Sequence, residues 1–300
     1  MVRYQNNHTI SIVANSNGFF TPDKKICKKQ VKFITELDLE DFIKFTIHDM
    51  GLTRKAYNNL SLLINGIFKY AKKKKLTQIS ITHFMGDLEL PRNIFSKQYK
   101  PKELEVFSED EIPLVTNYLK DHPDIWNLAL LLQFETGMRI GELTALKHVD
   151  IHPDHILISR TERKVKNEEG KWIVDVQEYP KTFAGFREVL LSPATVKTIR
   201  KIKMINPFGE YLFMNNGKRI RSNTINKRLH IECDELGISF RSTHKIRKTY
   251  GTTLLDGDVD ESLIAEQMGH EDISTTKQYY YYSNKSKKNK LKQISQAINY

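Results

Sequence analysis

Apolar residues recur at helical spacing over two stretches in the first third of the chain. The first stretch runs from Glu36 to about Met50, and the second follows Thr53, a residue type that caps helix N-termini. The side chains expected on the buried faces are Leu37, Leu39, Phe42, Ile43 and Ile47, then Tyr57, Leu60, Leu63, Ile64, Ile67, Phe68 and Tyr70. The pattern predicts a helical domain over 31–85, after a basic segment, 1–30, with one short strand at 10–13.

The periodicity stops over 86–107, where Gly86, Pro91 and Pro101 interrupt it. This composition is typical of an interdomain linker. Ser108 and Glu111 then form the Ser-x-x-Glu pattern of a capping box, which predicts a helix start. A second domain is therefore expected over 108–282, followed by a basic tail, 283–300.

The second domain mixes helical patterns with short strand-like runs. Helices are expected at about 108–120, 124–137, 139–146, 193–205, 222–236, 242–256, 260–268 and 273–282, and strands at 156–158, 172–176, 188–191 and 211–214. The fold class that follows is mainly α with a small antiparallel β-sheet.

The charge balance narrows the class of partner. Forty-seven Lys+Arg against thirty-six Asp+Glu give a net charge of +11, which favours a polyanion, nucleic acid before an anionic membrane. Cys27 and Cys233 match no metal-ligand spacing and fit a reducing compartment. No apolar run approaches eighteen residues and no secretory signal is visible, so we expect a cytoplasmic, nucleoid-associated protein.

Five positions in the second domain carry residue types suited to phosphate chemistry. His244 and Arg247 are three apart, so on a helix they share a face. Tyr279 lies nine residues after His270, and Arg139 lies far upstream in Thr-Gly-Met-Arg-Ile-Gly-Glu-Leu. A guanidinium is planar, permanently charged and forked to meet phosphate oxygens. A phenol that attacks phosphorus must lose its proton as it does so.

These boxes resemble the catalytic signature of the tyrosine recombinases, the phage-type integrases that cut and rejoin DNA. The resemblance extends over about 36–282 and is specific in 136–147, 180–190 and 243–280. It implies a helical core-binding domain over 31–85 and a mixed α/β catalytic domain.

The resemblance implies a role for each site residue. Arg139 and Arg247 would bind the phosphate, Lys181 would protonate the leaving 5′-oxygen, His244 would take the phenol proton, His270 would bond a non-bridging oxygen, and Tyr279 would attack phosphorus. Glu142, one helical turn after Arg139, is placed to hold that guanidinium. Lys164 and Lys166 remain alternatives to Lys181.

Two further basic segments are candidates for contacts outside the site. The second helix ends in Lys72, Lys73, Lys74 and Lys75, and DNA phosphate would relieve their mutual repulsion, although the helix dipole also favours cations there. The tail resembles the family's C-terminal helix, which often packs on a neighbouring subunit, here through Leu291, Ile294 and Ile298. A disordered basic tail is the alternative.

No metal or cofactor is expected. Carboxylates do not cluster as in a two-metal site, and His152 and His155 lack further zinc ligands. The resemblance implies a recombinase that forms a 3′-phosphotyrosine and a Holliday junction as a homo-tetramer on specific double-stranded DNA sites, with or without a directionality factor. Phage, conjugative-transposon and chromosomal origins stay open, as do a non-catalytic architectural DNA-binding protein and a type IB topoisomerase.

Overall fold

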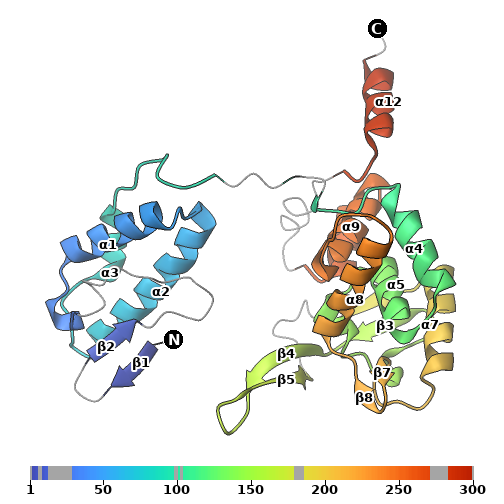
Figure 1. The fold of residues 1–300 in the computed structure, drawn as a ribbon, viewed down its shortest axis with the longest axis horizontal. Coiled ribbons are helices and arrows are strands. Elements are labelled where there is room, and N and C mark those ends of the chain that lie inside the picture. Colours follow the sequence, from blue (N-terminus) through green and yellow to red (C-terminus); the bar gives the residue numbers. More distant parts are fainter. Residues whose placement is uncertain are drawn as a thin grey trace. The chain divides into compact units, whose positions relative to one another are not determined.

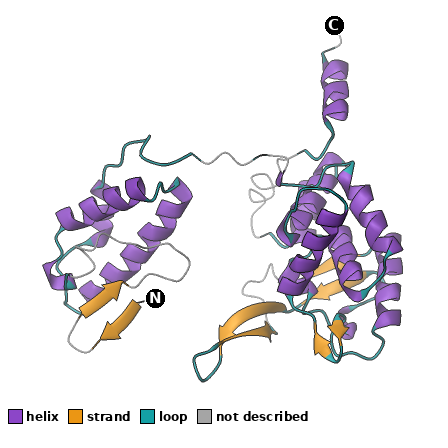
Figure 2. Ribbon diagram, in the orientation of Figure 1, coloured by secondary structure: helices purple, strands orange, loops and turns teal. Residues whose placement is uncertain are grey.

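The computed structural model describes residues 2–5, 9–12, 29–97, 101, 104–178, 186–270 and 283–298. The chain forms two compact units, Met1–Tyr99 and Lys100–Tyr300 (Figure 1). Helices predominate in both units, and the strands form small antiparallel pairs (Figure 2). The predicted fold class, mainly α with a small antiparallel β component, is confirmed.

The first unit holds one strand pair and three α-helices in its described part. The elements are β1 (Val2–Gln5), β2 (Thr9–Ile12), the 3-10 helix η2 (Val31–Phe33), α1 (Glu36–Asp49), α2 (Arg54–Lys73) and α3 (Ile81–Asp87). Thr35 and Asp38 form a capping box at the start of α1, and the Thr53 side chain caps α2. Neither β1 nor α3 was predicted from the sequence.

The core of this unit lies between α1 and α2. Phe42, Ile43 and Ile47 are buried on α1, and Leu60, Ile64 and Phe68 are buried on α2. Three residues expected in the core, Leu37, Leu63 and Tyr70, are instead exposed. They lie off the i, i+3, i+4 stripe that faces the other helix, and their apolar character alone did not reveal this.

Both ends of the predicted 86–107 linker pack on a core. Phe95 is buried in the first unit, where its ring lies 5.4 Å from that of Tyr57. Phe107 is buried in the second unit. The expected linker was therefore too long at both ends. The prolines and lysines around Phe95 and Phe107 gave the segment the composition of a linker, although both aromatic side chains are buried.

The second unit begins with the predicted capping box. The Ser108 backbone N–H donates to Glu111 Oε2 at 2.8 Å, and the Glu111 N–H donates to Ser108 Oγ at 3.2 Å. The helices that follow are α4 (Glu111–Asp121), α5 (Ile125–Thr136), α6 (Ile140–Leu143) and the 3-10 helix η4 (His148–Asp150). Gly137 ends α5 in the left-handed conformation, with φ of 63°.

The strands of the second unit form three antiparallel pairs among the described residues. β3 (His155–Ile158) pairs with β6 (Arg187–Leu190), β4 (Thr161–Lys166) with β5 (Trp172–Gln177), and β7 (Met214–Asn215) with β8 (Lys218–Arg219). β4 and β8 were not predicted. The six residues of β4 are mostly polar and show no apolar alternation, because the β4–β5 hairpin exposes much of both its faces. The strand expected at 211–214 is wrong over most of its length, since only Met214 belongs to a strand.

Helix α5 is the centre of the second unit. It is apolar on all sides, and Leu128, Leu130, Leu131 and Leu132 are almost fully buried. The helices that follow the strands are α7 (Pro193–Ile205), α8 (Ser222–Glu235), α9 (Thr243–Asp256), α10 (Glu261–Met268) and α12 (Lys287–Ala297). Of these, α7, α8 and α9 contact α5, as does α4. The helix expected at 273–282 lies outside the described residues.

The tail contains a helix, α12, whose start is fastened to the second unit. Glu109 Oε1 accepts hydrogen bonds from the Ser286 N–H at 2.8 Å and from Asn289 Nδ2 at 2.6 Å. In the part of the chain that the structure describes, no helix is long and apolar enough to span a bilayer.

Candidate active site

Three arginines from different elements hold the C-terminal end of α10. They donate to three consecutive carbonyls: Arg187 Nε to Gln267 at 2.9 Å, Arg247 Nη2 to Met268, and Arg139 Nη2 to Gly269 at 2.9 Å. The last carbonyls of a helix lack intrahelical partners and carry partial negative charge, so they are good acceptors for guanidinium groups. The end of α10 is therefore the point where β6, α9 and the start of α6 meet.

Gly269 turns the backbone out of α10 so that His270 joins this cluster. Its φ of 62° is left-handed, a conformation that glycine adopts without the penalty a side chain brings. The His270 N–H then donates to the Ala265 carbonyl at 2.9 Å, and His270 Nε2 lies 3.1 Å from Arg247 Nη2. The imidazole is thus held against a permanent cation.

A buried carboxylate, Glu142, joins two of the arginines. Its Oε1 accepts from Arg139 Nη1 at 2.8 Å, and its two oxygens accept from Arg187 Nη1 and Nη2 at 3.1 and 2.8 Å. Burial would raise the pKa of Glu142, but the Arg187 hydrogen bond and the charges of Arg187, Arg139 and Arg247 hold it at about 2. Glu142 is therefore an anion at neutral pH, and the contact expected between it and Arg139 is present.

The two arginines assigned to phosphate binding differ in exposure. Arg247 is buried, and its Nη1 also donates to the Gly137 carbonyl at 2.8 Å. The Arg139 side chain is 45% exposed although it is held by Glu142 and Gly269. This combination presents a fixed guanidinium to solvent, while the buried guanidinium of Arg247 donates to the carbonyl of the preceding residue, Met268.

Both histidines are disfavoured as cations. Desolvation, followed by the charges of Arg247, Arg139 and Arg187, lowers the pKa of His270 to about 4. Desolvation and the charges of Lys248, Arg247 and Lys245 also lower the pKa of His244 in the first turn of α9. At neutral pH both rings are therefore neutral, the state in which a histidine accepts a proton.

Glu105, which sequence reasoning missed, neutralises two lysines on α9. It accepts hydrogen bonds from Lys245 Nζ at 2.5 Å and from Lys248 Nζ. Burial would raise its pKa, but these hydrogen bonds hold it at about 2. Lys245 and Lys248 flank Arg247, so Glu105 limits the repulsion within this helix. Glu105 lies in the segment expected to be a linker, so no ion pair with α9 was predicted for it.

The structure brings Arg139, Glu142, Arg247 and His270 together, with His244 one helical turn before Arg247. Lys181 and Tyr279 lie outside the described residues. The alternative lysines, Lys164 and Lys166, are exposed on β4, where Lys166 Nζ lies 5.4 Å from the centre of the Trp172 ring. In the first unit, Lys72–Lys75 are exposed at the end of α2.

The described residues contain no group of three or more His, Cys, Asp or Glu side chains arranged to hold a metal ion. His152 and His155 stack, with ring centres 4.4 Å apart, and His155 Nδ1 lies 2.8 Å from Asp154 Oδ1.

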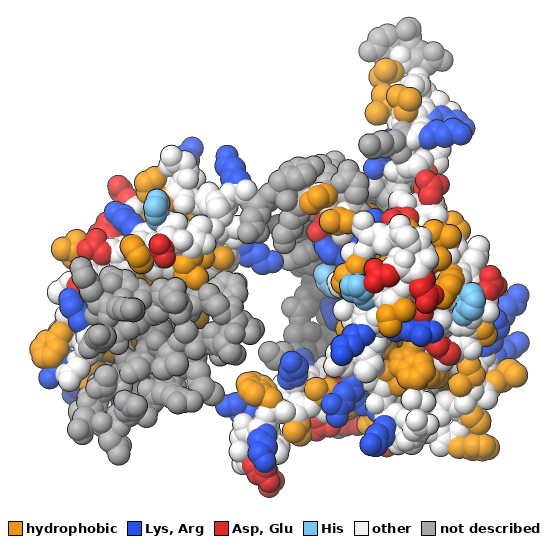
Figure 3. All heavy atoms as spheres, viewed as in Figure 1, with side chains coloured by type: hydrophobic (Ala, Val, Ile, Leu, Met, Phe, Trp, Pro, Cys, Tyr) orange, Lys and Arg blue, Asp and Glu red, His pale blue; other side chains and the backbone are white. Residues whose placement is uncertain are grey.

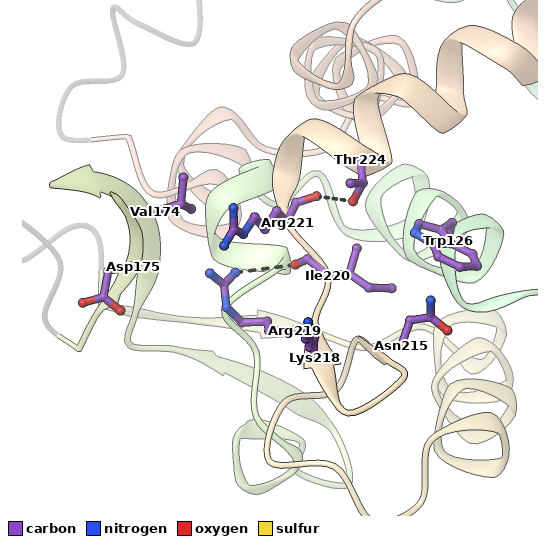
Figure 4. A pocket seen from close by; sticks show the side chains of 9 residues that line it. All are labelled: Trp126, Val174, Asp175, Asn215, Lys218, Arg219, Ile220, Arg221 and Thr224. Atoms are coloured by element: carbon purple, nitrogen blue, oxygen red, sulfur yellow. Dashed lines mark hydrogen bonds between the residues drawn. The ribbon is translucent and has the colours of Figure 1, made fainter. Parts of the chain in front are cut away.

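A separate pocket of about 520 Å³ lies between the β4–β5 and β7–β8 hairpins and the start of α8 (Figure 4). Its lining includes Trp126, Lys218 and Arg221 and none of the arginines at the end of α10. Lys and Arg side chains gather over these hairpins on the visible face of the second unit (Figure 3).

Comparison with known proteins gives the same residues a family context. The model of the phage integrase family matches residues 105–287. The tyrosine recombinase XerC-like protein of Caldanaerobacter subterraneus subsp. tengcongensis is 29% identical over 199 residues, which cover 59% of this chain and 50% of the relative. The ICEBs1 integrase of Bacillus subtilis is 24% identical over 278 residues, covering 87% and 70%. The chain thus spans half the length of the first relative and more of the second.

Solved structures share the fold. The Tn1549 transposon integrase in complex with a circular intermediate DNA aligns with a TM-score of 0.66 at 16% identity, covering 91% of this chain and 89% of that one.

Proposed function

Because the chain belongs to the phage integrase family, we propose that it is a site-specific tyrosine recombinase. It cleaves and rejoins specific double-stranded DNA sites through a covalent 3′-phosphotyrosine and a Holliday junction, and it integrates and excises a mobile element. The observation that carries the proposal is the convergence of Arg139 and Arg247 on the carbonyls beside His270. It creates a fixed cluster of positive charge of the kind that a phosphoryl transition state requires.

The arginine pair binds the scissile phosphate. Arg139 offers an exposed guanidinium whose other bonds, to Glu142 and Gly269, prevent it from swinging away. Arg247 adds charge from within the protein. Because both groups are in place before DNA arrives, little reorganisation is needed as negative charge grows on the non-bridging oxygens.

Proton transfer is assigned to the remaining residues. Tyr279 Oη attacks phosphorus, its proton passes to neutral His244, and the P–O5′ bond breaks as Lys181 protonates the leaving oxygen. His270 bonds a non-bridging oxygen. One phosphodiester replaces another, so a 5′-hydroxyl from a second DNA strand can reverse the step without ATP.

The first unit and α12 are assigned to assembly on DNA. Lys72–Lys75 contact the phosphate backbone from the end of α2, as part of a core-binding domain. Leu291 and Ile294 on α12 and Ile298 at its C-cap are exposed at positions i, i+3 and i+7, which supports packing on a neighbouring subunit of a homo-tetramer. A directionality factor would act on this assembly, and nucleoid association follows from DNA binding.

Covalent capture tests the proposal. Sites selected from a randomised duplex pool by binding would be rebuilt with a nick that lets the short 5′-hydroxyl fragment diffuse away. We expect a denaturation-resistant adduct, in which mass spectrometry of the digested protein places the nucleotide on Tyr279. Absence of an adduct on every selected site would refute the proposal, whereas equal adduct yield on scrambled DNA would indicate a type IB topoisomerase.

A further inference from the structure

We infer that Arg187 is a positioning residue for DNA cleavage: it ties Glu142 to the Gln267 carbonyl and so fixes Arg139 relative to His270. The inference rests on the proposed function and adds a residue to its machinery. Arg187 lies on β6, on a different element from Arg139, Arg247 and His270.

All three nitrogen atoms of the Arg187 guanidinium donate hydrogen bonds, two of them to Glu142 and one to Gln267. Nη1 and Nη2 meet the two oxygens of Glu142, and Nε meets the carbonyl of Gln267. Glu142 in turn holds Arg139 through its guanidinium and its backbone N–H, the latter at 2.9 Å. One planar group therefore sets the distance between the start of α6 and the end of α10.

A second contact fastens β6 to the same turn of α10. The Leu190 N–H donates to Gln267 Oε1 at 2.9 Å, and Gln267 is buried. Gln267 is thus held through its backbone by Arg187 and through its side chain by Leu190. Since Gly269 and His270 follow directly, the placement of β6 determines where the imidazole lies.

Arg187 acts through its neighbours because it is shielded from solvent. Its side chain is only 4% exposed, and Glu142 is 6% exposed. A DNA phosphate therefore meets Arg139 and His270 and not Arg187. Lysine cannot replace this geometry, since its single ammonium lacks the planar fork that reaches a carboxylate and a carbonyl together.

The chain offers a matched control in Arg219. Its side chain is 12% exposed and bonds to Glu162, which is 6% exposed, so this is also a largely buried arginine–carboxylate pair. Arg219 Nη1 lies 2.5 Å from Glu162 Oε2, and Glu162 Oε1 accepts from the Ser222 N–H and hydroxyl. This pair also bonds Thr144 at the end of α6, since Arg219 Nη1 donates to its carbonyl and its hydroxyl donates to Glu162 Oε2, both at 3.4 Å.

The test compares Arg187→Lys with Arg219→Lys in the full chain. Folded protein is measured by thermal unfolding, DNA affinity by titration, and adduct formation by single-turnover rates with saturating nicked site. We expect both variants to lose stability, DNA affinity to stay near wild type, and only Arg187→Lys to lose about 100-fold in adduct rate, as a roughly 1 Å misplacement would. Equal rates for the two variants, after correction for folded protein, would overturn the inference.

A pH profile and a second variant separate positioning from stability. In Arg187→Gln, the buried Glu142 loses its main stabilising hydrogen bond, so its pKa rises and the acid limb of the adduct rate moves to higher pH; Arg219→Gln should not move it.

Gln267→Leu removes only the Leu190 contact and should slow adduct formation even if Arg187→Lys does not fold. A wild-type rate in Gln267→Leu and an unmoved acid limb would count against Arg187. Failure of the proposed function is a distinct result, since the wild-type protein would then form no adduct.

Discussion

Arg247 Nη2 lies 3.1 Å from Nε2 of His270, and the same nitrogen donates to the Met268 carbonyl. Because arginine carries only donors, Nε2 must be the accepting nitrogen, so the ring is neutral with its proton on Nδ1. A permanent cation therefore selects the protonation state of the histidine that the proposal places on the DNA phosphate.

This contact predicts an unusual titration of His270. We expect NMR of ring-labelled protein to show a pKa near 4, well below the ordinary 6.5, because desolvation and three guanidinium charges oppose protonation. Since the unfolded chain binds this proton more readily, the contribution of His270 makes the protein less stable as pH falls from 6.5 toward 4. Arg139→Gln removes one charge and should raise the pKa. A His270 signal that titrates near 6.5 in the wild type contradicts the assignment.

A side chain introduced at position 137 should destabilise the protein through a steric clash. Its φ is +63°, its carbonyl accepts from Arg247, and an added Cβ would lie 2.3 Å from Cδ1 of Tyr250. Gly237 is the matched control, since its φ is +65° and an added Cβ meets nothing within 4 Å. We expect Gly237→Ala to cost about 1–2 kcal/mol from left-handed strain alone. Gly137→Ala should cost clearly more in denaturant unfolding, and a smaller or equal loss would refute the clash.

The ion pairs that Glu105 forms with two lysines should stabilise the protein in a pH-dependent way. Glu105→Gln should lower the free energy of unfolding at pH 7 by about 1–3 kcal/mol, because two lysines lose a charged acceptor. The folded pKa of about 2 is below the ordinary 4.5, so this contribution is present above pH 4.5 and is lost as pH falls toward 2. Unfolding measured from pH 7 to pH 2 should show the two proteins converging. A difference that is constant with pH would assign the effect to packing.

Substitution of Tyr279 should separate DNA binding from DNA cleavage. Tyr279→Phe should abolish the covalent adduct on a nicked site, because no phenol remains to attack, while DNA affinity stays near wild type. Tyr280→Phe is the register control and should still form the adduct. The reverse outcome, cleavage by the first variant and none by the second, would shift the nucleophile by one residue. Gel shift and denaturing electrophoresis measure the two properties on the same samples.

Local pattern predicted most of the described helices, although not α3, and it placed Glu142 beside Arg139. Capping signals at Thr53 and Ser108 coincide with the starts of α2 and α4, because a cap depends on contacts within one helical turn. The spacing of His244 and Arg247 likewise implied a shared helix face, and Glu142 was expected beside Arg139 for the same local reason.

Only the tertiary structure decided which residues far apart in the sequence form hydrogen bonds and ion pairs with one another. Arg187 and Gln267 are separated by 80 residues and Glu105 and Lys248 by 143, and no helical or strand period links such positions. The same limit applies to Leu37 and Leu63, whose exposure depends on where the neighbouring helix lies. Periodicity reports contacts along one element, whereas the ionic network around α10 depends on how α6, β6 and α9 converge.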